Sequence, residues 1–327
     1  MFLKMLAFEW RYFVRQPSFI VTCLVFFLLP FLAMVVPQVQ IGSGGNVLFN
    51  SPYAIAQVLL ILSIFSMFMV VNFVGDTALR NETSHMAEIV YTKPIRPFGY
   101  QLGRFVGAYL ICVTVFAMVP LGTLVGTWMP SVDSERLGPL NLAAYVQPFL
   151  IFSVTTLFIL AAIFYAVAQR SRSLMLVYMF ALGLFVAYTV AGQVFDEPHQ
   201  RFMRAITDPF GLNAYRDYTR YWTPFERNGE LAGLTGVILQ NRMLWLGIGL
   251  AALLLGGRLF RPLTVFNRSA KPAKKQAEQV VAPTLAFHPV KGGAGKWWPQ
   301  FMTRTRFEMR QVFLSPAFLL LTAFSAS

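Results

Sequence analysis

The chain alternates between long apolar runs and shorter polar segments. A helix needs about 20 apolar residues to cross the hydrocarbon core of a bilayer, and six runs come near or exceed that length. The pattern therefore predicts an all-α integral membrane protein with a six-span transmembrane domain at 18–260. The predicted spans are 18–36, 52–74, 105–129, 142–168, 174–195 and 243–259.

The sixth predicted span is short. We expect Arg242 and Arg258 to extend from its two ends toward water. The apolar stretch 231–239 just before it is too short to cross, and we interpret it as a re-entrant or surface helix.

Residues 1–17 precede the first span and have the period of a helix. Lys4, Arg11 and Arg15 fall on one side of a helical wheel, and mostly apolar side chains fall on the other. This pattern predicts an amphipathic helix in the headgroup region. The residues assigned to it are Glu9, Arg11, Arg15 and Pro17. A signal peptide is the alternative, but 18–36 is long for its apolar core and no small-residue cleavage site follows.

Segment 75–104 is the first long polar interruption of the apolar pattern. A turn back into the bilayer needs only a handful of residues, whereas this segment carries both signs of charge and two prolines. It predicts a short helix, broken by proline, that docks a partner protein. The residues assigned to this role are Asp76, Arg80, Glu82, Glu88 and Pro94.

Composition supports a membrane protein and sets its expected orientation. Of the 327 residues, 56% are hydrophobic and 13% charged, and the net charge is +13. Twenty of the 27 lysines and arginines lie on the side of the N-terminus, which predicts a cytoplasmic N-terminus and a cytoplasmic linker. Basic residues in such a protein set topology and contact lipid headgroups, so no nucleic-acid partner is expected.

Segment 261–299 changes composition to proline, alanine, lysine and glycine, and predicts a flexible basic linker in the cytoplasm. Its VKGGAGKWW sequence has Val290 at the first glycine of a phosphate-binding loop and Trp297 at the magnesium-binding hydroxyl. We therefore expect no nucleotide site and no cofactor.

Residues 300–327 repeat the start of the chain. FEMRQVFLSPAF, which begins at Phe307, matches FEWRYFVRQPSF, which begins at Phe8, without a gap. Long-period similarity of this kind indicates a duplicated unit, as in many transporters. We expect 300–327 to be the start of a second copy, with an interfacial helix and a truncated seventh span, in a longer protein.

Few residues in the sequence support a catalytic role or a metal site. His85, His199 and His288 lie in different loops, and no zinc-ligand spacing occurs, so neither an enzyme nor a metal site is expected. No predicted span has a charged residue at its centre. This absence disfavours ion coupling and leaves energy to come from outside the membrane.

The F-E-x-R sequence at Phe8, ahead of a proline, and the charged first loop resemble the membrane subunit of type-2 ABC exporters. The loop residues that carry this resemblance are Arg80, Glu82, Glu88 and Pro94. The resemblance implies that segment 75–104 holds a coupling helix for a separate cytoplasmic ABC ATPase, with the N-terminal amphipathic helix alongside it. It also implies a second permease half, in the same chain or a partner, and a place in a bacterial inner membrane.

The duplicated form also resembles large bacterial permeases fused to a C-terminal zinc aminopeptidase domain. The alternative function is accordingly a polytopic anchor or scaffold for a fused or associated catalytic domain, without transport. A third hypothesis is an intramembrane enzyme, but the predicted spans contain no pair of catalytic residues.

Overall fold

The computed structural model describes residues 2–36, 41–42, 44–84, 97–195 and 197–259, together with Met302 and Arg306. The chain divides into two units, Met1–Val265 and Phe266–Ser327. The predicted linker 261–299 lies outside the described residues, as does 300–327 apart from Met302 and Arg306. The description below concerns the first unit.

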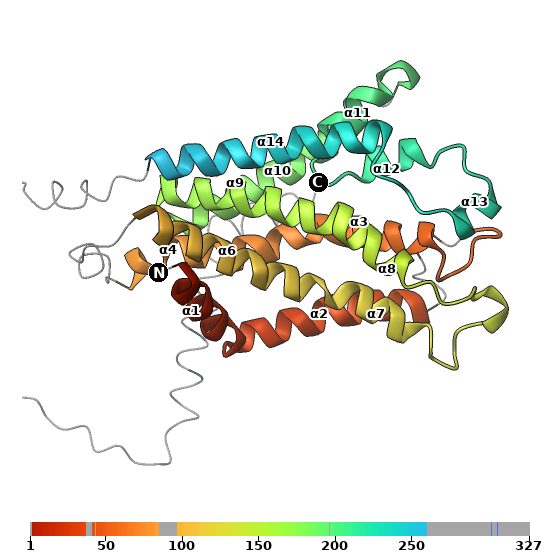
Figure 1. Cartoon of the computed structure of the whole chain (residues 1–327), viewed down its shortest axis with the longest axis horizontal. Coiled ribbons are helices and arrows are strands. Elements are labelled where there is room, and N and C mark those ends of the chain that lie inside the picture. Colours follow the sequence, from red (N-terminus) through yellow and green to blue (C-terminus); the bar gives the residue numbers. More distant parts are fainter. Residues whose placement is uncertain are drawn as a thin grey trace, which may run out of the picture. The chain divides into compact units, whose positions relative to one another are not determined.

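The fold of this unit is all-α, with no strand among the described residues (Figure 1). In the described part of the chain, six helices are long and apolar enough to span a membrane, so the protein is a multi-pass membrane protein. The long helices and their extensions are α1 (Phe2–Val14), α2 (Pro17–Val35), α3 (Pro52–Val70), η2 (Val71–Gly75), α4 (Asp76–Thr83), α6 (Pro97–Phe116), α7 (Met118–Gly126), α8 (Ala143–Pro148), η4 (Phe149–Val154), α9 (Thr155–Ser171), α10 (Leu174–Val194) and α14 (Gly236–Leu259). The short helices are η3 (Ser134–Arg136), η5 (Pro198–Gln200), α11 (Arg201–Thr207), α12 (Leu212–Tyr218) and α13 (Pro224–Gly229).

The second span is the core of the bundle. Of the residues in its most apolar stretch, 78% are buried, whereas in the fifth span, α10, the corresponding share is 11%. The helix begins sharply, because Pro52 occupies its first turn and the Ser51 hydroxyl accepts a hydrogen bond from the Ala54 N–H at 3.1 Å. The exposed apolar side chains of α2, α10 and α14 are those expected to face lipid.

Glycines let α2 and α7 approach closely. A Cβ on Gly122 would lie 2.3 Å from the Phe27 carbonyl oxygen, and one on Gly126 would lie 2.8 Å from the Met34 Cβ. Their spacing of four residues places both on one face of α7, a pattern that membrane helices use for close packing. The backbones of α2 and α7 therefore lie closer together than a larger residue at either glycine would allow.

Two π-helical turns, η2 and η4, interrupt the second and fourth spans. η4 directly follows Pro148, whose ring removes a backbone N–H and clashes with the preceding turn. η2 lies where the second span passes into α4, and such single π turns are common at functional sites.

The sixth span differs from the prediction. Residues 231–235 are not helical, and 236–239 form the first turn of α14, so 231–239 is neither a re-entrant nor a surface helix. The expectation that Arg242 reaches water from a helix end was also wrong. Arg242 lies inside α14 and is 2% exposed.

Arg242 is held by a buried polar cluster instead. Its guanidinium donates to the Thr156 hydroxyl at 2.9 Å and to the Asn241 side-chain oxygen at 2.6 Å. Asn241 in turn donates to the carbonyl oxygens of Ala205 and Asp208, at 2.7 and 2.8 Å. These bonds satisfy the arginine without water and fasten α11 to α14 and α9.

Candidate functional site

The candidate site is a set of buried charges where α1, α4 and α6 meet, at the end of the bundle that holds the N-terminus (Figure 1). α4 continues the second span, and α6 begins the third. The two helices flank the residues 85–96, which lie outside the described part of the chain. The set therefore joins α1 to both ends of the predicted docking segment 75–104.

Two glycines of α6 allow α1 to pack directly on its backbone. A Cβ on Gly103 would lie 3.0 Å from the Phe2 carbonyl oxygen, and one on Gly107 would lie 2.7 Å from the Glu9 Cβ. This is a second pair of glycines four residues apart in the third span. The close approach brings Glu9 into the interior, where it is 0% exposed.

The Glu9 carboxylate lies between two arginines. Its Oε2 accepts a hydrogen bond from Arg80 Nη1 at 2.7 Å, and Arg104 Nε lies 3.4 Å from its Oε1. The second contact is an ion pair without hydrogen-bond geometry. Arg104 is 2% exposed, and its Nη2 donates to the Thr77 carbonyl oxygen. One carboxylate on α1 thus pairs with a cation on each side of the docking segment.

Arg80 is the most highly connected residue of the set. Its Nε and Nη2 donate to Asp76 Oδ2 at 3.1 and 2.8 Å, and Nη2 lies 3.3 Å from the Thr77 hydroxyl. Its guanidinium carbon lies 3.8 Å from the ring centre of Tyr12, a cation–π distance. Arg80 therefore contacts α1 through both a charge and an aromatic face.

The burial of Glu9 and Arg104 makes the set sensitive to the loss of either of these two charges. Removing one partner of a buried pair typically costs about 3–5 kcal/mol, because the remaining charge is left without compensation. Without Glu9, Arg104 would lose its ion pair and Arg80 would keep only Asp76 as an acidic partner. Glu9 therefore links α1 by charge to both α4 and α6.

The predicted site residues are only partly brought together. Glu9, Asp76 and Arg80 meet in the set, and Pro17 begins α2. Arg11 and Arg15 are exposed and line, with Lys4 and Tyr12, an open groove of about 740 Å³ along α1. The Glu82 side chain, Glu88 and Pro94 lie outside the described residues.

Arg104 and Thr77 were not among the predicted site residues. In the sequence, Arg104 counts only among the twenty basic residues expected on the side of the N-terminus. The signal that could have found it is its place inside the Gly103–Gly107 pair, where a helix packs closely. Thr77 acts through its backbone carbonyl, which the sequence does not distinguish.

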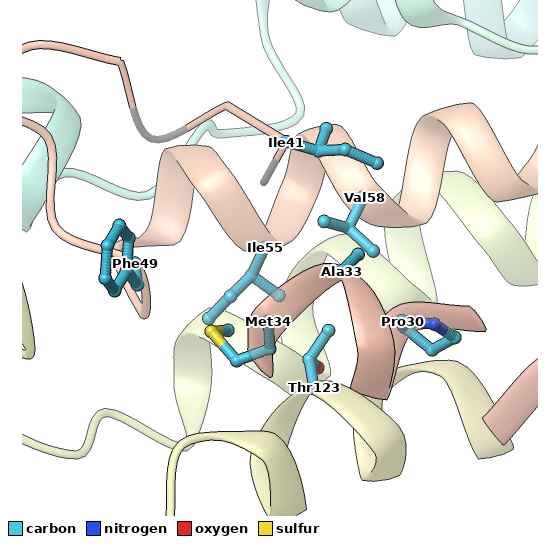
Figure 2. Close-up of a pocket in the computed structure, with 8 residues that line it drawn as sticks. All are labelled: Pro30, Ala33, Met34, Ile41, Phe49, Ile55, Val58 and Thr123. Atoms are coloured by element: carbon cyan, nitrogen blue, oxygen red, sulfur yellow. The ribbon is translucent and has the colours of Figure 1, made fainter. Parts of the chain in front are cut away.

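The bundle also contains a small apolar void between α2, α3 and α7 (Figure 2). Met34, Ile55 and Thr123 are among its lining side chains, and its volume is about 10 Å³. That is about the size of one water molecule, far below the several hundred Å³ of a ligand pocket. In the part of the chain that the structure describes, no three histidine, cysteine or acidic residues lie together as metal ligands would.

Comparison with known proteins adds no assignment. No family model matches the chain, and no curated protein matches it significantly.

Proposed function

We propose that the chain is the membrane subunit of an ATP-driven exporter of the ABC type. In this proposal a separate cytoplasmic ATPase binds segment 75–104 and moves it during its cycle. The Glu9 set transmits that movement to α1 and to the second and third spans. The observation that carries the proposal is one buried carboxylate paired with Arg80 and Arg104, at the two sides of the segment.

This arrangement suits transmission of force for a physical reason. If the segment moves relative to α1, at least one arginine must leave Glu9, and a buried charge without a partner is costly. The alternative of lower energy is that α1, α4 and α6 move together. The π turn η2, on the membrane side of Asp76, gives the second span a place to bend during this movement.

The orientation belongs to the same proposal. The excess of lysine and arginine on the side of the N-terminus supports a cytoplasmic location for α1 and segment 75–104. The membrane would be a bacterial inner membrane. The repeat that starts at Phe307 supports a second permease half, in a longer chain or in a partner.

The test separates docking of the ATPase from transmission of its movement. Glu82→Ala with Glu88→Ala should abolish co-purification of the ATPase, since these residues belong to the predicted docking surface. Glu9→Gln should leave co-purification intact but abolish stimulation of ATP hydrolysis by the membrane subunit in vesicles. Glu135→Gln, an exposed acid on η3 at the other end of the bundle, is the matched control.

Two results would contradict the proposal. If Glu9→Gln stimulated hydrolysis as well as the unmodified protein does, the buried set would have no part in coupling. If no ATPase co-purified with the unmodified protein, the exporter function itself would be wrong. The second result would favour the anchor or scaffold.

A further inference from the structure

A basic groove lies between α11 and α12, at the end of the bundle opposite to α1 (Figure 1). It is open and has a volume of about 400 Å³, within the range of small-ligand sites. The described residues that line it are all polar or charged: Arg201, Arg204, Asn213, Arg216, Asp217 and Arg220. Within the described part of the chain, four guanidinium groups thus share one hollow with a single carboxylate.

The charge in the groove is not balanced by that carboxylate. Among the described residues, Arg201, Arg216 and Arg220 have no carboxylate oxygen within 4 Å. Like charges held this close repel each other, and a bound anion would relieve the repulsion. The planar fork of arginine matches the oxygens of a phosphate group with two parallel hydrogen bonds.

The walls of the groove are held in place from behind. Asp208, which connects α11 to α12, is buried and accepts hydrogen bonds from the N–H groups of Phe210 and Asn213 at 2.8 and 2.6 Å. Asn241 ties the end of α11 to α14. The arginines therefore project from an ordered scaffold, which lowers the entropy lost on binding.

The position of α11 favours a lipid as the source of the phosphate. On this helix Phe202 and Met203 are 52% and 53% exposed, and a step of 100° per residue places them opposite Arg201 and Arg204. The indole N–H of Trp245 donates to the Ile206 carbonyl oxygen at 2.9 Å. Tryptophan is enriched at the membrane–water boundary, where a helix with one apolar and one cationic side rests on the headgroups.

We propose that the groove between α11 and α12 binds a phosphate group, presented by the headgroup of an anionic phospholipid. The apolar side of α11 contacts the acyl region, and the arginines receive the phosphate. This site is separate from the Glu9 set and does not depend on the exporter function.

The test uses the full chain and native mass spectrometry. The retention of phosphatidylglycerol and of phosphatidylcholine is measured for the unmodified protein, for Arg216→Gln with Arg220→Gln, and for the control Arg227→Gln on α13. Arg216 and Arg220 are exposed, so their loss should leave the fold intact. Each lost guanidinium should weaken phosphatidylglycerol binding about tenfold, as expected for charge-assisted hydrogen bonds. Replacement of both by lysine should restore part of the affinity, since the charge remains but the fork does not.

A second arm distinguishes the lipid from the free anion. Inorganic phosphate is added to lipid-depleted protein, and the thermal unfolding midpoint is measured. In one outcome, phosphate raises the midpoint of the unmodified protein but not that of the double variant, while mass spectrometry shows equal retention of the two lipids. That result supports the site, with free phosphate as its ligand. If the double variant retained phosphatidylglycerol as Arg227→Gln does, and phosphate affected neither, the proposal would be overturned.

Discussion

Gly107 offers the sharpest test of how α1 is docked. In Gly107→Ala the new Cβ would lie 2.7 Å from the Glu9 Cβ. Carbon atoms in contact are about 3.5–4.0 Å apart, so α1 must move away by about 1 Å. The Glu9–Arg80 hydrogen bond of 2.7 Å would then lengthen beyond the normal range of such bonds. Overpacking of this kind typically costs about 1–3 kcal/mol.

The assay can use a cysteine that the chain already has. Cys112 is 0% exposed and lies on α6, the same helix as Gly107, whereas Cys23 is partly exposed. In a Cys23→Ser background, a thiol-reactive fluorophore should therefore report unfolding of α6 alone. A loss of 1 kcal/mol lowers the midpoint by about 2–4 °C in domains of roughly this size. We expect Gly107→Ala to lower it by several degrees.

The control is Gly183→Ala on α10, where the added Cβ would have no neighbouring atom within 4 Å beyond the adjacent backbone of its own helix. Alanine is the better helix former, so this change should leave the midpoint unchanged or raise it. If Gly107→Ala behaved as Gly183→Ala does, α1 would not be packed on α6 as described. The role of Glu9 in the proposed function would then lose its basis.

Two further predictions concern the opposite end of the bundle. Arg242→Ala leaves the buried Thr156 and Asn241 oxygens without their donor and should cost about 1–3 kcal/mol for each unsatisfied oxygen; limited proteolysis should then cut between α10 and α14 faster than in the exposed control Arg11→Ala. In α13, hydrogen bonds from the Thr223 N–H and hydroxyl hold the pKa of Glu226 below its usual value. Its carboxylate therefore supports the helix cap above pH 4.5, and this support is lost as the pH falls through the lowered pKa. Hydrogen-exchange protection of α13 should follow this pH dependence, and Glu226→Ala should abolish it. Protection that did not change with pH in the unmodified protein would contradict the role of the cap.

The six spans could be predicted because they depend on local composition. Apolar length is compared with the thickness of a bilayer, and no tertiary contact enters that comparison. The predicted ends of the spans were least accurate where a helix continues beyond its apolar residues. The second span runs through Asp76 into α4, because Asp76 and Arg80 pair one turn apart. The sixth begins at Gly236, because Arg242 has buried partners that keep it inside the helix.

The candidate site could be predicted only in outline. The residue pattern predicts segment 75–104 and α1 as separate features, one for a partner protein and one for lipid headgroups, and only the family resemblance implies that they lie side by side. Nothing in either segment indicates that Glu9 and Arg80, 71 positions apart, form a pair. The orientation, the repeat and the ATPase remain predictions.

The class of protein follows from the residues alone, because hydropathy measures a preference between water and lipid that each segment has independently of the others. Which charges are buried, and which residues pair with them, depends on how the helices pack together. Whether Glu9 faces solvent or two arginines depends on how closely α1 approaches α6. That approach depends on the absence of a Cβ at Gly103 and Gly107, and its consequence appears only when the two helices meet.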